Sequence, residues 1–498
     1  MTGTATMHRG RRRLLALAAV VLGGALTLSA CTSNGDDGTP PSISKSPSTA
    51  SSAEGSSPTA GGAAGATPVG AKWDWGRFDS YRSYLQSMVG GPTFYELTWC
   101  GVEPSQGLLN WDAVDRVVKR IDGLGMTPML KIRTGMCWAT QGTAQYQRGK
   151  ADKTESGMPK SMDQYEAFVK AVVTRYSTMG VHEFALENEV NSPSYWGGTP
   201  AQLQELMEAG SQAIRAANSS AKVVDFGLAS TTYGYGIAED LLKAGKPQEA
   251  VTAYNDYFQR RIGTRGDKIP RVTTAAQLQS VLGSEQGKRN LTYLAMATSL
   301  AEKHVVDIRQ IHFYEKWSSV PALMDYVRQH TPSGTPIEAW EVGSFWKDGD
   351  GSADERGQEV TKTVADLLAA GVTKVIWLPL TVDPTGRNSD EPRYGLLDPD
   401  GTVRPAGSAL SSVASAARGA TTVPVASDGL SGVGFERDGS STLFVWGTRD
   451  VALPANANLA TPGETPTSVS KGDKAPTANS VQEIHVKGTV SDFLKEAS

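Results

Sequence analysis

Two glutamates stand near the ends of short apolar runs that lie far apart in the chain. Glu189 ends the run FALENE (184–189), and Glu341 lies near the end of PIEAWEVG (336–343). Two carboxyl groups facing each other across a sugar can cleave a glycosidic bond, because one donates a proton to the leaving oxygen while the other attacks the anomeric carbon. A separation of about 5–5.5 Å gives retention of configuration, and a wider one leaves room for water and gives inversion.

Both runs are typical of β-strands, and strand alternation predicts which side chains face the same way. In a regular strand, Glu187 and Glu189 share one face of the first run. The same alternation puts Glu341 toward the site and leaves Glu338 and Trp340 on the opposite, outer face of the second run. We therefore expect Glu189 and Glu341 to form the catalytic pair, with Glu338 as the alternative nucleophile.

Eight such apolar runs alternate with helical patterns, which predicts an α/β fold, a TIM (β/α)8 barrel with its active site at the carboxyl ends of the strands. The alternative is an open doubly wound sheet. A doubly wound sheet that binds a nucleotide would have a GxGxxG turn after the first run, but this chain has GRFDSYRSY there. The expected strands span 69–75, 93–99, 127–135, 182–189, 221–229, 306–314, 335–343 and 373–380. The expected helices include 111–125, 162–180, 200–218, 321–330, 355–371 and 406–419.

Two regions depart from this alternation. Residues 230–305 exceed what one helix needs, and 235–261 within them reads as helical. We expect this insertion to lie on the catalytic face and to wall the site. After the barrel, expected over 71–419, residues 420–498 show period-2 alternation and turn residues, which predict a small C-terminal β-domain or β-extension.

The amino end reads as a targeting segment. An arginine-rich start precedes the apolar stretch 14–28, which is short for a membrane span. The stretch ends in LSAC, which resembles the lipobox of bacterial lipoproteins, so that residues 1–31 would be a signal peptide ending in a lipidated Cys31. A plain secretory signal is the alternative. Residues 32–70 are rich in Ser, Gly, Thr, Pro and Ala, which predicts a disordered tether. The expected location is the extracellular face of the cell membrane, with the lipid as anchor.

The remaining cysteines, the net charge and the histidines bear on disulfide formation, nucleic-acid binding and metal binding. Cys100 and Cys137 each follow an expected strand, so they form either a disulfide or two buried free thiols. Net charge is −4 and no long basic block follows the first residues, which gives no indication of nucleic acid binding. The six histidines are scattered and there is no CxxC, so the sequence predicts neither a metal site nor a cofactor.

An ordered set of motifs resembles the clan A glycoside hydrolases, and within them the group around family 39. The set covers most of the expected barrel, and each motif alone is weak. Its members are WCGVEPSQGLLNW (99–111), the Asn-Glu pair at 188–189, IHFY (311–314), AWEVG (339–343), VIWLPL (375–380) and YGLLDPDGTVRPA (394–406).

The resemblance implies a role for each matching residue. Glu189 would be the general acid/base and Glu341 the nucleophile. Asn188 would bond the 2-hydroxyl of the sugar. Tyr314 would hydrogen-bond Glu341 and keep it ionised, because a donor to the charged form lowers a carboxyl pKa.

Aromatic residues would complete the sugar site. The resemblance implies that His312 and Trp377 line the −1 subsite, with Trp377 as a stacking platform. Trp99 and Trp196 follow strand ends and are candidate subsite walls, with core packing as the alternative for each.

Two positions depart from the family pattern. The family often has an arginine in the second strand, where this chain has Glu96, and the nearest arginine is Arg133 in the third. An aromatic residue often precedes the Asn-Glu pair, where this chain has Glu187. A third carboxyl group near Glu189 would either raise the pKa of the acid/base by like-charge repulsion or bind substrate.

The sequence thus predicts a glycoside hydrolase that acts on an extracellular poly- or oligosaccharide and needs no cofactor, and the family resemblance implies that it retains the anomeric configuration. The alternative, from another functional class, is a catalytically inactive, glycan-binding lipoprotein.

Overall fold

A computed structural model describes residues 65–72, 78–142, 155–263, 269–344, 351–380, 395–478 and 480–496. Each of the eight predicted barrel strands is present within these ranges, and only Pro92 extends one residue beyond a predicted run. The strands are β1 Val69–Ala71, β2 Pro92–Thr98, β3 Thr127–Arg133, β4 Glu183–Leu186, β5 Lys222–Val224, β6 Arg309–Phe313, β7 Ile337–Val342 and β8 Val375–Trp377. The lipidation prediction at Cys31 lies outside the described residues.

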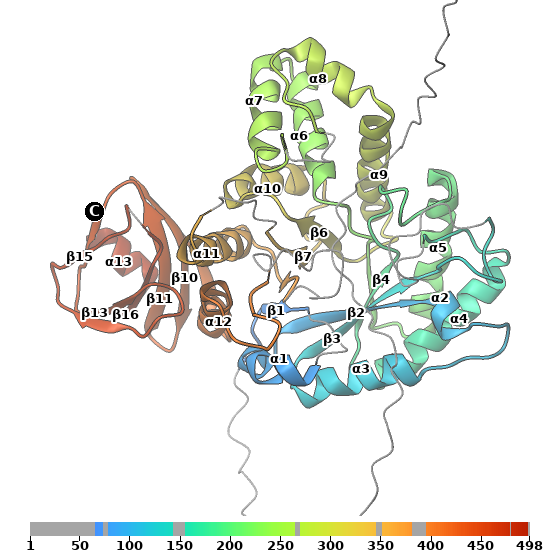
Figure 1. Cartoon of the computed structure of the whole chain (residues 1–498), viewed down its shortest axis with the longest axis horizontal. Helices are drawn as coiled ribbons and strands as arrows, with labels where there is room; N and C mark the ends of the chain where they lie inside the picture. Colours follow the sequence, from blue (N-terminus) through green and yellow to red (C-terminus); the bar gives the residue numbers. More distant parts are fainter. Residues whose placement is uncertain are drawn as a thin grey trace, which may run out of the picture.

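The eight strands form one closed ring, which rules out the open sheet. All neighbours pair in parallel, in the orders β1-β8-β7-β6 and β2-β3-β4-β5. A bridge between Val224 and Ile308 joins β5 to β6, and β1 packs beside β2 (Figure 1). At that second junction a Cβ on Gly70 would lie 1.8 Å from the carbonyl oxygen of Pro92, so the close approach of β1 requires glycine.

Helices surround the ring, as the periodicity predicts. In α3, for example, Val114, Val117, Val118 and Ile121 recur at helical spacing and are all buried. Capping boxes at Thr199 and Ser352 start α5 and α11. The barrel helices are α1 Phe78–Leu85, α2 Trp99–Val102, α3 Asp112–Gly123, α4 Met162–Ser177, α5 Pro200–Ala217, α10 Val320–Gln329, α11 Ala353–Ala369 and α12 Pro405–Ala417, with short 3-10 turns η2 Gln86–Met88 and η3 Trp317–Ser319.

The insertion between β5 and β6 is helical and stands beyond the ring (upper part of Figure 1). It consists of α6 Thr231–Lys243, α7 Pro247–Tyr257, α8 Ala275–Leu282 and α9 Glu285–Glu302. The segment 235–261, predicted to be helical, is helical and is divided between α6 and α7. The reason is local: Gly245 has a φ of 73°, and Pro247 starts the next helix.

Strand β7 is not regular, and the alternation predicted for it is wrong. Ile311 pairs with Ala339 but His312 pairs with Glu341, so the strand has one extra residue, a β-bulge. Trp340 therefore lies inside the barrel, in a cluster with Phe94 and other inward residues. The bulge then lets Glu341 face inward as well.

Glu338, predicted to point outward, also lies inside, near the amino ends of the strands. It accepts a hydrogen bond from Trp340 Nε1 at 2.7 Å and forms an ion pair with Lys374 at 3.1 Å. Lys374, directly before β8, also pairs with Glu183 of β4 on the opposite side of the ring. Glu338 thus belongs to a partly buried ion-pair group at the bottom of the barrel. The structure therefore does not support Glu338 as the alternative nucleophile.

The C-terminal region is a β-domain that packs on the barrel. Its main sheet is antiparallel with the order β14-β13-β16-β11-β10-β9. Phe435, Phe444 and Trp446 belong to the same apolar cluster as the barrel helices, and Lys362 of α11 lies over the rings of Trp317 and Trp446. The elements are β9 Thr421–Ser427, β10 Leu430–Arg437, β11 Ser440–Gly447, β12 Val451–Ala452, β13 Ala457–Ala460, β14 Thr467–Val469, β15 Lys474–Ala475, β16 Gln482–Lys487 and α13 Val490–Glu496.

Within the described ranges, no helix combines the length and the apolar character needed to cross a membrane.

Candidate active site

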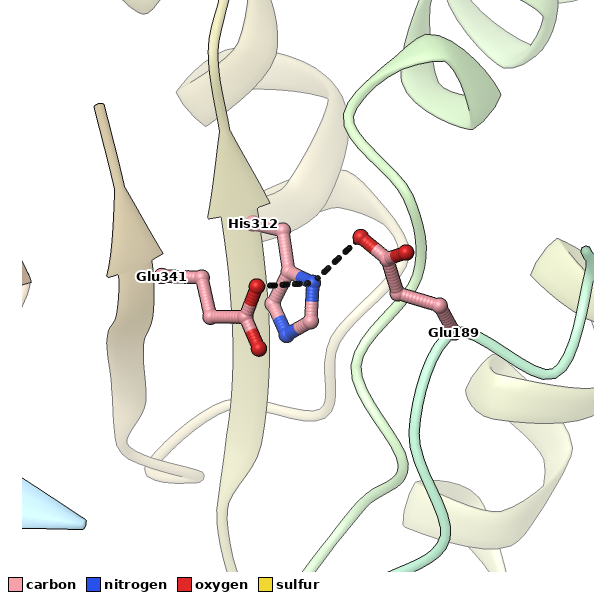
Figure 2. A group of neighbouring side chains, drawn as sticks. All are labelled: Glu189, His312 and Glu341. Atoms are coloured by element: carbon pink, nitrogen blue, oxygen red, sulfur yellow. Dashed lines mark hydrogen bonds and ion pairs between the residues drawn. The ribbon is translucent and has the colours of Figure 1, made fainter. Parts of the chain in front are cut away.

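The two predicted glutamates meet at the carboxyl ends of the strands. One oxygen of Glu189, one of Glu341 and a ring nitrogen of His312 all lie within 4.8 Å of one another. His312 Nδ1 is 3.0 Å from Glu189 Oε1 and 3.6 Å from Glu341 Oε2, so the imidazole links the two carboxyl groups (Figure 2). This separation suits the retaining geometry better than the wider inverting one.

Glu341 is fully buried and held at both carboxylate oxygens. Lys131 Nζ donates to Oε1 at 2.6 Å, and the Tyr314 hydroxyl donates to Oε2 at 3.0 Å. Burial alone would raise the pKa of this carboxyl. Attraction from His312, Lys131 and Lys72 outweighs that effect and lowers the pKa to about 2. Glu341 is therefore ionised at neutral pH, as a carboxylate nucleophile must be.

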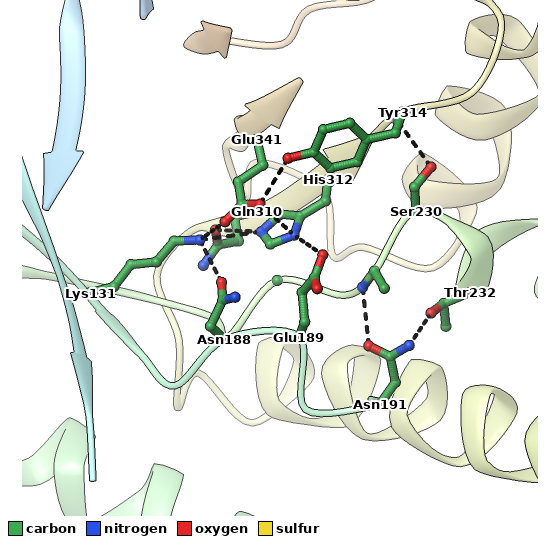
Figure 3. Close-up of polar contacts among 12 residues, drawn as sticks. Lys131, Asn188, Glu189, Asn191, Ser230, Thr232, Gln310, His312, Tyr314 and Glu341 are labelled. Carbon is green, nitrogen blue, oxygen red and sulfur yellow. Dashed lines mark hydrogen bonds and ion pairs between the residues drawn. The ribbon is translucent and has the colours of Figure 1, made fainter. Parts of the chain in front are cut away.

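Lys131 is a site residue that the sequence analysis missed. Besides Glu341, its ammonium group donates to Asn188 Oδ1 at 2.6 Å (Figure 3). A signal was present in β3: Met129 lies in the inner cluster, so the alternation also turns Lys131 and Arg133 into the barrel. Two cations at inward positions of one buried strand indicate carboxyl partners nearby.

Glu189 sits on a backbone turn. β4 ends at Leu186, and φ is 63° at Glu187 and 42° at Glu189, in the left-handed region that non-glycine residues seldom adopt. Such conformations persist only where neighbouring contacts hold them.

The insertion supplies those contacts. Arg289 of α9 donates to the carbonyl oxygens of Val190 at 3.0 Å, Asn191 at 2.8 Å and Trp196 at 3.1 Å. The Asn191 side chain is in turn bonded to Thr232 and to the neighbouring Asn290 of α9. Arg289 therefore fastens the loop that carries Glu189.

Glu187 faces a second buried charge cluster beside the first. Arg133 pairs with Glu96 at 2.9 Å and approaches Glu187 Oε2 at 3.7 Å, while Glu187 Oε1 accepts the backbone N–H of Thr134 at 2.7 Å. Burial raises the pKa of Glu187 against the attraction of Arg133. For Glu96, burial is outweighed by Arg133, Lys72 and Lys131, and the pKa is lowered.

The structure contradicts the predicted platform at Trp377. Ile376 and Leu378 on either side of it belong to the inner cluster, whereas Trp377 is fully buried in the cluster between the strands and the helices. The inward position at the end of β8 is thus occupied by Leu378. The motif match identified Trp377, whereas the residue that faces the site is the next one, Leu378.

The predicted subsite walls at Trp99 and Trp196 are core residues as well. Trp99 is 1% exposed, stacks on Phe168 and donates to Glu103 Oε2 at 2.6 Å. Trp196 is 0% exposed and donates to the carbonyl oxygen of Thr199 at 3.2 Å. Both side chains pack in the core beneath the loops that follow the strands. The alternative prediction, core packing, is therefore the correct one for Trp99 and for Trp196.

A disulfide joins Cys100 and Cys137, which confirms the paired alternative. Cys100 lies in α2 directly after β2, and Cys137 lies just after β3. The bond therefore joins α2, which follows β2, to the segment after β3, at the carboxyl ends of both strands.

Glu189, His312 and Glu341 are also close enough together to act as ligands of one metal ion, which the scattered histidines did not predict. The Lys131 ammonium group already lies against Glu341 and supplies a positive charge there. The described residues of the site therefore contain their own cation.

Known proteins resemble this chain in structure. No protein-family model and no curated protein sequence matches it. A family 39 glycoside hydrolase from the gut symbiont Bacteroides cellulosilyticus WH2 is 15% identical, with a TM-score of 0.56 over 85% of this chain and 81% of that one. A GH39 beta-xylosidase from Caulobacter crescentus is 13% identical, with a TM-score of 0.51 over 85% and 97% of the two chains. The GH39 enzyme from Xanthomonas axonopodis pv. citri is 11% identical, with a TM-score of 0.52 over 86% and 96%. The chain therefore has the fold of the family 39 glycoside hydrolases.

Proposed function

We propose that this protein is a retaining glycoside hydrolase that cleaves an extracellular poly- or oligosaccharide. The observation that carries the proposal is the meeting of Glu189 and Glu341 at the carboxyl ends of the barrel strands, with one oxygen of each within 4.8 Å. The fold likeness to family 39 enzymes supports the same reaction class.

In the first step, a carboxylate oxygen of Glu341 attacks the anomeric carbon. The bond from that carbon to the leaving oxygen breaks, and the leaving oxygen takes the proton of the Glu189 carboxyl group. The product is a covalent glycosyl ester of Glu341. Tyr314 and Lys131 hold the two oxygens of Glu341 and so fix the direction of attack.

In the second step, the Glu189 carboxylate removes a proton from water. The water oxygen attacks the anomeric carbon, the ester bond to Glu341 breaks, and Glu341 leaves as a carboxylate. Two inversions at one carbon give net retention. His312 Nδ1 lies 3.0 Å from Glu189 Oε1 and 3.6 Å from Glu341 Oε2, so it contacts both carboxyl groups before the first step.

Asn188 is placed to recognise the sugar. Its Oδ1 accepts from Lys131, which leaves the amide N–H groups as donors. We assign those donors to the 2-hydroxyl of the sugar in the −1 subsite, in accord with the family resemblance.

A substrate screen with paired variants tests the proposal. The parent, Glu341→Gln and Glu189→Gln are assayed on aryl glycosides and bacterial glycans, with Glu166→Gln, an acid on the outer helix α4, as the matched control. We expect Glu189→Gln to lose about 10²–10⁴-fold in rate on poorly activated substrates, and Glu341→Gln to lose at least as much. Equal activity of the parent and both variants would refute the assignment. Binding of a glycan with no product would instead favour the inactive, glycan-binding alternative.

We further propose that Cys31 carries the lipid anchor and that the stretch from residue 32 to residue 64 is the tether, because Val69 and Gly70 already belong to β1. A flexible chain of this length would have a root-mean-square span of about 30 Å. Cys31→Ala should move the protein from the membrane fraction to the medium. Continued membrane retention of that variant would contradict the anchor.

A further inference from the structure

Lys131 is bound to the two residues that the first chemical step uses. Its side chain is fully buried, and Nζ lies 2.6 Å from Glu341 Oε1 and 2.6 Å from Asn188 Oδ1 (Figure 3). Nζ is also 3.4 Å from His312 Nε2 and 4.4 Å from the centre of the Phe94 ring. A buried ammonium group needs its counterion close by, because water cannot solvate it there.

Ester formation on Glu341 removes that counterion. A carboxylate that becomes a neutral ester carries no net charge, so the attraction to Lys131 is lost for as long as the intermediate lasts. The ion pair therefore stabilises the enzyme before the first step and after the second, but not the covalent intermediate between them. An interaction that is stronger in one state than in another changes the relative populations of the two.

We propose that Lys131 is a positioning residue that shortens the life of the covalent glycosyl-enzyme and keeps Glu341 ionised as a leaving group. This inference rests on the proposed function of the same site. In the second step the bond between the anomeric carbon and Glu341 breaks, the electron pair stays on Glu341, and the new carboxylate regains Lys131 as its partner. The ammonium charge thus assists departure of Glu341, and its bond to Asn188 keeps the sugar-binding amide in place throughout.

The other charged groups around this pair do not replace Lys131. Glu341 is faced by His312 and Tyr314 from the β6 segment, by Glu189 from the loop after β4, and by the Lys72 charge from the end of β1. Among the contacts described for Glu341, only that with Lys131 joins a full positive charge directly to a carboxylate oxygen at hydrogen-bond distance. Glu96 of β2, which attracts Lys131 and Lys72, is itself paired with Arg133.

Lys131→Gln tests the charge while keeping an amide that can donate to Glu341 and Asn188. Lys131→Arg keeps the charge, and Lys170→Gln, a partly exposed lysine of α4 in a surface ion pair, is the matched control. Two quantities are measured on an aryl glycoside that the parent cleaves. The first is the acid limb of kcat/KM against pH. The second is the fraction of enzyme present as glycosyl-enzyme at saturating substrate, from rapid quench and intact-mass spectrometry.

We expect Lys131→Gln to move the acid limb upward by roughly one pH unit or more, because an opposite charge nearby lowers a carboxyl pKa by about that much. The glycosyl-enzyme fraction should rise several-fold, with a burst of the aryl leaving group. Lys131→Arg should stay closer to the parent in both, and Lys170→Gln should equal it. A structural defect alone would lower activity without moving the acid limb.

Two results would overturn the inference while leaving the proposed function intact. One is an inactive Glu341→Gln together with a Lys131→Gln variant whose acid limb and glycosyl-enzyme fraction equal those of the parent. The other result is an acid limb of the parent enzyme at or above about 4.3, the pKa of an ordinary glutamate. This measurement needs no variant at Lys131, so it remains decisive if Lys131→Gln does not fold. Full activity of Glu341→Gln would instead refute the proposed function itself.

Discussion

Glu189, just after β4, and Glu341, in β7, bring one carboxylate oxygen each within 4.8 Å of the other, with His312 Nδ1 in contact with both. The two residues play different parts because their surroundings differ. Glu341 is enclosed by cationic and hydroxyl donors, whereas the described contact of the Glu189 carboxyl group is with His312. The lasting negative charge therefore belongs to Glu341.

Arg289→Ala should impair catalysis from outside the site. The change leaves three loop carbonyl oxygens without their donor, which costs about 1–3 kcal/mol where such groups are buried, and it releases the strained turn at Glu189. We expect kcat to fall about tenfold or more, while the melting temperature stays above the assay temperature. Steady-state kinetics and thermal melts check this. Arg271→Ala, at an exposed position, is the control. An unchanged kcat for Arg289→Ala would show that the loop keeps its conformation without the hydrogen bonds from Arg289.

Gly70→Ala should prevent the barrel from closing. The added methyl group would lie 1.8 Å from Pro92 O, a contact that only backbone movement could relieve. We expect insoluble protein or a loss of several kcal/mol in unfolding free energy. Gly123→Ala is the matched control, because nothing lies within 4 Å of its Cβ position at the end of α3. Equal melting temperatures for the two variants would mean that β1 is not seated against β2 as described.

Removing the disulfide should destabilise the protein. The two cysteines are 37 residues apart, and a loop of that length predicts a stabilisation of about 3–4 kcal/mol through the unfolded chain. The double variant Cys100→Ala/Cys137→Ala should melt at a lower temperature, as should the parent after reduction. A double variant that melts with the oxidised parent would contradict this.

Asp366→Asn should stabilise the protein increasingly as pH rises from about 4 to above 7. Burial raises the pKa of Asp366 to about 7, against the attraction of Lys362. A carboxyl group whose folded pKa is raised favours the folded state when protonated, so stability falls as pH rises from about 4 through 7. Denaturant titrations should show a gain of up to a few kcal/mol at pH 8 and none at pH 4. The exposed Asp325→Asn is the control, and a gain that does not vary with pH would refute the titration.

Sequence periodicity predicted the elements well because it depends on local burial. The runs that became β2 and β3 have alternating or continuous apolar faces, and the helix over 162–180 carries the expected spacing. The insertion was identified by its length, and Gly245 with Pro247 marks the break between α6 and α7 within the segment predicted to be helical.

Irregular geometry accounts for most of the errors. The bulge in β7 turned Trp340 inward, and no residue in that run signals it. Trp377 stands one position from the inward Leu378, a difference that motif matching cannot detect. Lys131 was overlooked because its partner Glu341 is more than 200 residues away, so only the closed barrel brings them together.

Trapping of the covalent intermediate tests the central claim most directly. The parent is treated with the 2-deoxy-2-fluoro glycosyl fluoride of the sugar found in the substrate screen, then digested and examined by peptide mass spectrometry. We predict one fluoroglycosyl adduct, on Glu341, and none on Glu338 in the same peptide. An adduct on another residue, or turnover of the natural substrate with inversion of the anomeric centre, would contradict the assignment.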